Sequence, residues 1–101
     1  MSFNLIDKNY NAEIGSFLYY LHEKDSFNTE EFVKLCGYID KLPFKSEETK
    51  EKLFFIQSQT LRHIIYHFDP TDQSYINNLP ENYWEYIEML EDSISKYIKC
   101  I

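Results

Sequence analysis

Residues 47–68 constrain the fold of this chain most, because apolar side chains recur along them at the spacing of a helix. Ser46 precedes them as an N-cap candidate, and Glu47 and Glu48 occupy the first turn, where the helix dipole favours acidic side chains. The main apolar side consists of Leu53, Leu61, Ile64 and Phe68. Other sides carry Phe54, Phe55, Ile56, Ile65 and Tyr66. Since a helix that is apolar most of the way round is usually central, we predict that the other helices pack on it.

A helix over residues 11–24 is predicted from apolar side chains at i, i+3, i+4 and i+7. These side chains are Ile14, Phe17, Leu18 and Leu21. The candidates for its N-cap are Asp7, Asn9 and Asn11. Gly15 weakens this helix slightly or allows a neighbour to approach closely.

Two more helices are predicted over residues 29–41 and 80–99. Asn28 and Glu31 form a capping-box-like pattern at the start of the former, and Pro80 suits the first turn of the latter. The buried side of 29–41 is predicted to consist of Phe32, Leu35, Cys36 and Ile39. The apolar arc of 80–99 consists of Tyr83, Ile87, Leu90, Ile94, Ile98 and Ile101, with acidic residues opposite.

Four helices joined by short connections predict an all-α fold, an irregular four-helix bundle formed by residues 1–101 as a single domain. No segment shows the period-2 alternation of a strand. The content of 44% hydrophobic and 18% aromatic residues argues against a disordered chain.

We expect a cytoplasmic protein, because the start of the chain lacks the features of an export signal and no apolar run is long enough to span a membrane. Cys36 and Cys100 are accordingly predicted to be reduced thiols. Abundant Lys, Asn, Ile, Tyr and Phe fit AT-rich codons, which suggests a low-GC bacterium or its mobile DNA as the source.

Residues 69–92 carry seven acidic side chains and no lysine or arginine, which equals the formal net charge of −7 of the whole chain. The same stretch holds large aromatic residues, which anchor protein interfaces while acids steer a basic partner. The negative charge disfavours direct binding to nucleic acid or to anionic membrane. The predicted partner-binding residues are Asp69, Asp72, Tyr75, Glu81, Trp84, Glu85, Tyr86, Glu88 and Asp92. The alternative for the acidic residues is a solvated face without a partner.

Patterns that could support catalysis or metal binding are incomplete. His63 and His67 have the i, i+4 spacing of zinc-binding helices, but neither H-E-x-x-H nor C-x-x-C adds ligands. We therefore expect packed or solvated histidines, with a pH-sensing pair as the alternative. Cys36 lacks the histidine of a nucleophilic site and is assigned to the core. No enzyme activity, metal or cofactor is expected.

The stretch of residues 28–36, NTEEFVKLC, resembles an early helix of nuclease-colicin immunity proteins. In size, acidity and helical profile the chain also resembles bacterial toxin-immunity proteins of the colicin and contact-dependent-inhibition types. This resemblance implies an inhibitor that masks a cognate toxin and has no catalysis of its own. The toxin-contacting helix and tyrosine-bearing motif of that family are not matched, so no residue role is transferred.

The function predicted from these observations is an immunity or antitoxin-type protein, which binds and masks a basic toxin, a nuclease, through residues 69–92. One alternative is an acidic nucleic-acid mimic, in which the carboxylates replace phosphates. Another is a helical adaptor subunit that binds through an apolar patch around Phe55 and Tyr66. A metal-dependent enzyme built around His63 and His67 is a further alternative.

Overall fold

The described part of the chain, residues 4–43, 46–71 and 75–99, contains five helices and no strand in the computed structural model. The helices are α1 (Leu5–Tyr10), α2 (Phe17–Glu23), α3 (Thr29–Asp40), α4 (Glu47–Phe68) and α5 (Tyr83–Lys99). The predicted all-α class is confirmed. The four-helix arrangement is not, because two short helices, α1 and α2, precede α3.

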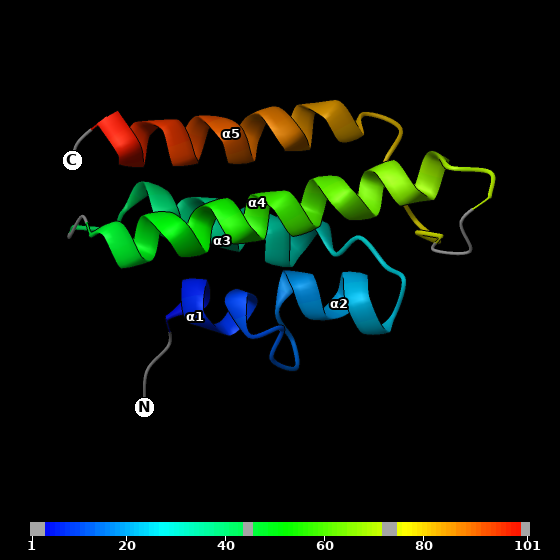
Figure 1. Cartoon of the computed structure of the whole chain (residues 1–101), viewed down its shortest axis with the longest axis horizontal. Coiled ribbons are helices and arrows are strands. Elements are labelled where there is room, and N and C mark those ends of the chain that lie inside the picture. Colours follow the sequence, from blue (N-terminus) through cyan, green and yellow to red (C-terminus); the bar gives the residue numbers. More distant parts are fainter. Residues whose placement is uncertain (1–3, 44–45, 72–74, 100–101) are drawn as a thin grey trace.

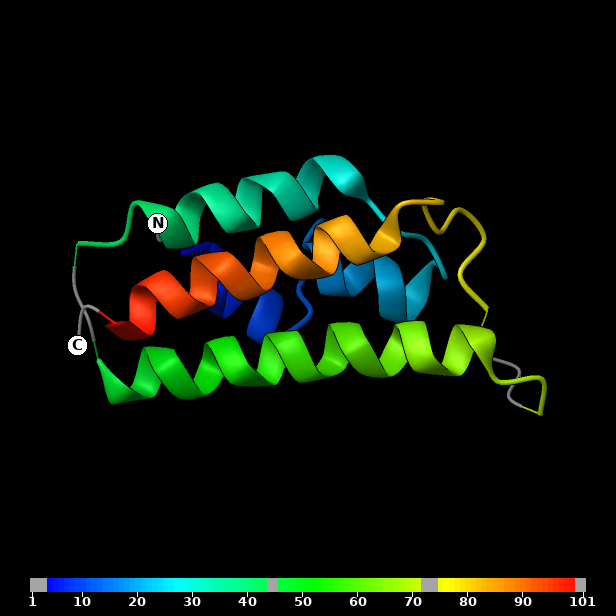
Figure 2. The same ribbon diagram turned by 90° about the horizontal axis from the view of Figure 1, so that it is seen from above.

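The helices form three layers. In Figure 1, α5 lies above α3 and α4, while α1 and α2 lie below them. From above, in Figure 2, α5 runs between α3 and α4. α4 packs against α1, α2 and α5, as expected for a central helix, but within the described residues its backbone does not contact that of α3. α3 packs against the same three helices, so α3 and α4 enclose the core from two sides.

The prediction of one helix over residues 11–24 is wrong. α1 ends at Tyr10 and α2 begins at Phe17. Between them, Gly15 adopts a φ of +91°, a left-handed conformation that interrupts a helix. Ser16 then caps α2, because its Oγ accepts the Tyr19 N–H at 3.1 Å. As a result, Ile14 leaves the predicted buried face and is 81% exposed.

Asn9 joins these two short helices and is not the N-cap that the sequence suggested. It is buried, and its Nδ2 donates to the Leu5 carbonyl at 2.9 Å. Its Oδ1 accepts the Leu18 N–H at 3.0 Å, which satisfies one of the donors that the start of α2 leaves without a helical partner. The N-cap of α1 is Asn4, whose Oδ1 accepts the Ile6 N–H at 2.9 Å.

The predictions for α3 are confirmed. Asn28 caps the helix by accepting the Glu31 N–H at 3.0 Å. The predicted buried side chains, Phe32, Leu35, Cys36 and Ile39, are all buried.

α4 has the predicted bounds and the predicted cap, Ser46, but its buried side is rotated from the expected one. The buried residues are Leu53, Ile56, Thr60 and Ile64. Leu61 is only half-buried and Phe68 is 56% exposed. The reason is that α1 and α2 cover one flank of α4 and α5 covers the other, so the buried centre lies between them. Apolar side chains of α4 that point away from these neighbouring helices remain exposed, and Ile65 is one of them, at 65%.

α5 begins at Tyr83, three residues later than predicted. Its buried side consists of Leu90, Ser93, Ile94 and Tyr97. The Tyr97 hydroxyl accepts the Ser46 N–H at 2.9 Å and so ties the C-terminal part of α5 to the start of α4.

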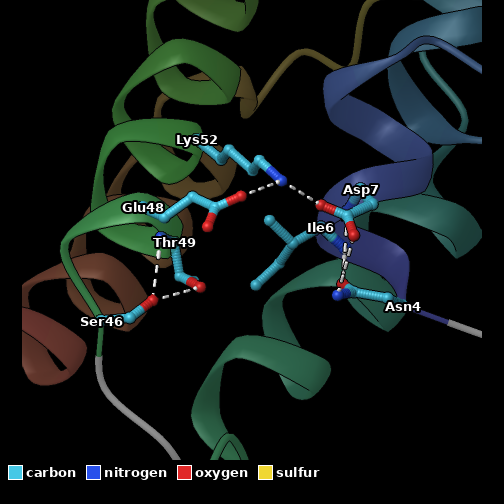
Figure 3. A network of polar contacts seen from close by, with 7 residues as sticks. All are labelled: Asn4, Ile6, Asp7, Ser46, Glu48, Thr49 and Lys52. Atoms are coloured by element: carbon cyan, nitrogen blue, oxygen red, sulfur yellow. Dashed lines mark hydrogen bonds and ion pairs between the residues drawn. The ribbon is translucent and has the colours of Figure 1, made fainter.

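An ion-pair network joins the N-terminal part of α4 to α1 (Figure 3). Lys52 Nζ lies 2.6 Å from the Asp7 carboxylate and 3.2 Å from that of Glu48. The hydrogen bond to Asp7, followed by that to Glu48, raises the pKa of Lys52 above its ordinary value. Charged side chains at this end of α4 therefore contribute to packing within the fold.

None of the helices in the described residues combines the length and apolarity required to cross a lipid bilayer.

Candidate partner-binding surface

The outward side of α5 carries an acidic ridge, which consists of Glu85, Glu88, Glu91 and Asp92. All four side chains are exposed. Within the described residues, none of them forms an ion pair with a lysine, arginine or histidine. Glu85 accepts a hydrogen bond from Asn82 Nδ2 at 2.8 Å, which holds its carboxylate near the start of α5. The ridge thus presents negative charge that the fold does not neutralise.

Trp84 lies beside this ridge in the first turn of α5 and is 51% exposed. Its indole packs edge-on against Tyr83, with 5.6 Å between ring centroids. Glu81 is exposed just before the helix. A large, rigid, half-exposed ring among carboxylates has the composition of an interface anchor.

Asp69 forms a local turn at the end of α4. Its Oδ1 accepts hydrogen bonds from the Thr71 N–H at 2.9 Å and from the Thr71 hydroxyl at 2.8 Å. These bonds, the backbone one first, lower the pKa of Asp69 below its ordinary value. Asp69 is exposed and keeps its negative charge at this end of the molecule. Asp72, another predicted site residue, lies outside the described residues.

Tyr75 stacks on His67, with 4.8 Å between the ring centroids and an interplanar angle of 28°. The next residue, Ile76, is buried, and its N–H donates to Nδ1 of His67 at 3.0 Å. This bond fixes the orientation of the imidazole, with Nδ1 turned toward the backbone of Ile76. Tyr75 itself remains 58% exposed, so the stacking orients its ring without hiding it.

Two asparagines fasten the segment after Ile76 to the connection between α2 and α3. Asn78 Oδ1 accepts the Phe27 N–H at 2.6 Å, and Asn78 Nδ2 donates to the Phe27 carbonyl at 3.2 Å. The Asn77 N–H donates to the Asp25 carbonyl at 2.7 Å. The backbone of this segment is thereby held in one position, although it belongs to no helix.

A groove of about 300 Å³ lies where the end of α4, this segment and the start of α5 meet. Its lining residues are His67, Phe68, Tyr75, Ile76, Asn77, Leu79, Pro80, Glu81 and Tyr83. Ring contacts run through it from Tyr75 to His67, from His67 to Phe68, and from Phe68 to Tyr83, with centroid distances of 4.8, 4.8 and 5.2 Å. The groove is therefore mainly aromatic, and Glu81 contributes a carboxylate to the lining that the structure describes.

Tyr86 is less exposed than the other predicted partner-binding residues that the structure describes. It is half-buried and packs edge-on against Phe27 and Phe32, at centroid distances of 5.5 and 5.6 Å. Because α3 packs against this side of α5, Tyr86 lies at the edge of the hydrophobic core and packs against its buried residues.

The two histidines with i, i+4 spacing have separate surroundings. His63 packs against His22 of α2, with 4.6 Å between ring centroids, whereas His67 packs against Tyr75. Burial, followed by the nearby His22, lowers the pKa of His63 below its ordinary value. Among the described residues, no group of three or more His, Cys, Asp or Glu side chains has the arrangement of a metal site.

Cys36 lies in the core, as predicted. Burial is the main reason why the pKa of its thiol rises to about 12, with a smaller contribution from Asp40. A thiol with so high a pKa carries almost no thiolate at neutral pH and is a poor nucleophile.

The structure thus brings together most of the predicted residues, while the groove beside them was not anticipated. Trp84, Glu85, Glu88 and Asp92 lie on α5, and Tyr75 and Glu81 line the groove next to its start. Phe68 and His67 were missed as groove residues, because helical spacing assigned the former to the core. The signal that could have located them is the run of aromatic residues at the end of α4, directly before a proline-containing connection.

Comparisons of the chain with protein-family models, with curated proteins and with solved structures found no match in any of the three.

Proposed function

We propose that this protein is a binding protein of the immunity or antitoxin type, which masks a basic toxin domain and performs no catalysis itself. The observation that carries the proposal is the acidic ridge of α5, whose carboxylates are exposed and without ion-pair partners in the described part of the chain. Elsewhere, Glu47, Glu48 and Asp7 pair with lysines of the same chain. The contrast supports a surface whose charge is complementary to another molecule.

Masking would be steric and electrostatic. The ridge would attract a basic active-site cleft or nucleic-acid-binding surface from a distance, which raises the association rate. Trp84 would then insert at the contact and slow dissociation, since buried aromatic anchors supply much of the affinity of protein interfaces. The toxin's own substrate would be excluded because the same cleft is occupied.

The test begins with affinity capture of the tagged protein from its host at low salt, followed by a wash at high salt. The immunity reading requires one stoichiometric basic protein that stops growth when expressed alone, and growth must be restored by co-expression of this chain. A captured protein that is harmless when expressed would contradict it. Several nucleic-acid-binding proteins eluting together with salt would instead favour the nucleic-acid mimic.

The purified partner then allows the surface to be tested by charge reversal. The double variant Glu88→Lys/Asp92→Lys should lower the association rate about tenfold at low salt, and high salt should abolish the difference. The matched control is Glu13→Lys/Glu23→Lys, which reverses two exposed acids outside α5, on and just before α2, whose backbone does not contact that of α5 in the described residues. If both double variants slow association equally, net charge is responsible and the ridge is not the contact.

Trp84→Ala should weaken partner binding roughly 30-fold, about 2 kcal/mol, mainly through faster dissociation. Phe54→Ala is its control, because Phe54 is a similarly exposed aromatic residue of α4, at 44% against 51%. Circular dichroism should show that both variants keep the wild-type helix content. An unchanged dissociation rate in Trp84→Ala would exclude it as an anchor.

A helical adaptor remains the second candidate, and the exposed apolar side chains of α4 favour it. Phe54 and Ile65 are 44% and 65% exposed, and at about 100° per residue they share one side of the helix. Phe55, which the sequence suggested for this role, packs against Tyr10 with 4.9 Å between ring centroids. An adaptor would lose its partner in Phe54→Ala/Ile65→Ala, and its binding would be insensitive to salt.

A further inference from the structure

We propose that the groove between the end of α4 and the start of α5 accepts one arginine side chain of the basic partner. This inference rests on the proposed function and names the contact that would give it specificity. It is argued from the shape of the groove, from the chemistry of its lining and from the absence of lysine and arginine in the lining that the structure describes.

The shape is that of a preformed side-chain site. The groove measures about 300 Å³, at the lower end of the size of ligand pockets. Its backbone is fixed by the bond from Ile76 to His67 and by the two bonds between Asn78 and Phe27. A site that is ordered before binding loses less conformational entropy when it is filled.

The lining suits a flat, weakly hydrated cation. Tyr75, Phe68 and Tyr83 present aromatic rings, on whose faces a guanidinium stacks with a favourable cation–π interaction. Leu79 and Pro80 add apolar surface for the methylene groups of the same side chain. Lysine fits less well, because its ammonium is more strongly hydrated and does not stack.

The described lining of the groove carries an acidic side chain and no Lys or Arg. The acidic side chain is that of Glu81. His67 also lines the groove, and its Nδ1 is engaged in accepting the Ile76 N–H. A carboxylate beside aromatic faces is the arrangement that pairs with guanidinium through charge-assisted hydrogen bonds.

The groove is continuous with the ridge. Tyr83 contacts Phe68 on the groove side and Trp84 on the ridge side, with centroid distances of 5.2 and 5.6 Å. A basic partner that lies along α5 would therefore reach the groove without crossing a positively charged surface. Trp84 and the arginine site would act as two neighbouring anchors.

The experiment uses N-acetyl-arginine methylamide as the probe, titrated into ¹⁵N-labelled protein. Saturable shifts in the millimolar range are expected at the amides of Phe68, Tyr75, Ile76 and Tyr83. The neutral isostere N-acetyl-citrulline methylamide should produce none of these shifts. Equal shifts with both probes, or arginine-induced shifts confined to the acidic ridge, would overturn the proposal.

Variants test the individual contacts. Tyr75→Ala should raise the dissociation constant of the arginine probe roughly fivefold, and Glu81→Gln should raise it roughly threefold. Phe54→Ala and Glu23→Gln are the matched controls and should leave it unchanged. Tyr75 is 58% exposed, so its loss should not disturb folding, which the rest of the spectrum reports.

The two proposals fail in different ways. If Glu88→Lys/Asp92→Lys weakens the captured partner but Tyr75→Ala does not, the groove is not an arginine site and the masking function stands. If arginine saturates the groove but no basic toxin is captured, the groove inference holds and the masking function fails.

Discussion

The two ends of α4 use charge in opposite ways. At the N-terminal end, Lys52 lies between Asp7 and Glu48, and Lys50 pairs with Glu47 at 2.8 Å. At the C-terminal end, acids are exposed without basic partners in the described residues, while aromatic rings and neutral hydrogen bonds hold the chain together. At the N-terminal end, the ion pair between Lys52 and Asp7 joins α4 to α1. At the C-terminal end, the acidic side chains are exposed to solvent. In the described residues, unpaired acids beside ordered aromatic rings therefore distinguish the C-terminal end of α4 from its ion-paired N-terminal end.

The largest effect on stability should come from truncating Ile76, the buried residue that packs the connection after α4 into the core. Ile76→Ala should lower the free energy of unfolding by about 2–4 kcal/mol, because it leaves a cavity in the core. Urea denaturation followed by circular dichroism measures this change. Ile65→Ala, on the exposed side of α4, should change it by less than about 0.5 kcal/mol. Equal losses in the two variants would mean that Ile76 does not hold the connection.

A smaller loss, about 1–2 kcal/mol, is expected for Asn78→Ala, because the Phe27 N–H and carbonyl both lose a hydrogen-bond partner. Since these bonds are neutral, the loss should be the same at low and high salt. Asn77→Ala is the control, because the fold uses the backbone N–H of Asn77 and not its side chain. A matching loss in Asn77→Ala would show that residue size, and not the amide pairing, is responsible.

At the N-terminal end, Lys52→Met should lower the melting temperature less than Ile76→Ala does, and the difference from wild type should shrink in 1 M salt. The reason is that screening weakens exposed ion pairs, whereas burial of apolar surface persists. Thermal unfolding at two salt concentrations measures this. A melting-temperature difference that is constant with salt would indicate that Lys52 acts through packing against Tyr10, whose ring centroid lies 5.5 Å from its Nζ.

The smallest effect concerns pH and the middle of α4. The folded protein holds the pKa of His63 below the ordinary value of 6.5, through burial first and then through His22, with Arg62 adding to the decrease and Asp25 opposing it. The unfolded chain therefore binds a proton more readily, so stability should be constant above pH 7 and decrease as the pH falls below 6.5. In His63→Gln, the free energy of unfolding should decrease less between pH 7.5 and pH 5.5 than in the wild type. Urea denaturation at the two pH values measures this difference. A decrease of the same size in His63→Gln would assign the effect to other groups.

Local signals allowed much of the fold to be predicted. The bounds of α4, the caps Asn28 and Ser46 and the buried side of α3 all follow from residues within one or two turns of each other. The exposure of Glu85, Glu88 and Asp92 likewise follows from the helical spacing of α5. These features depend on neighbours along the chain, which a sequence displays directly.

The missed features depend on contacts between distant segments. Gly15 weakened the expected helix, but only the arrangement around it, with Ser16 capping α2, turns a weak position into a break. Tyr86 is half-buried because it packs against Phe32 of α3, a contact that the acids beside it in the sequence do not indicate. The groove needs residues from two helices and a connection, so no single pattern in the sequence could describe it.

The pairing of Asn78 with Phe27 has a consequence for the order of assembly. It joins residues 51 positions apart, so it can form only after the intervening segments have come together. Contacts of such long range form late relative to the helices themselves. The groove is consequently finished near the end of folding, and a nascent or partly unfolded chain would lack it. A partner that recognises the groove would select finished molecules and ignore immature ones.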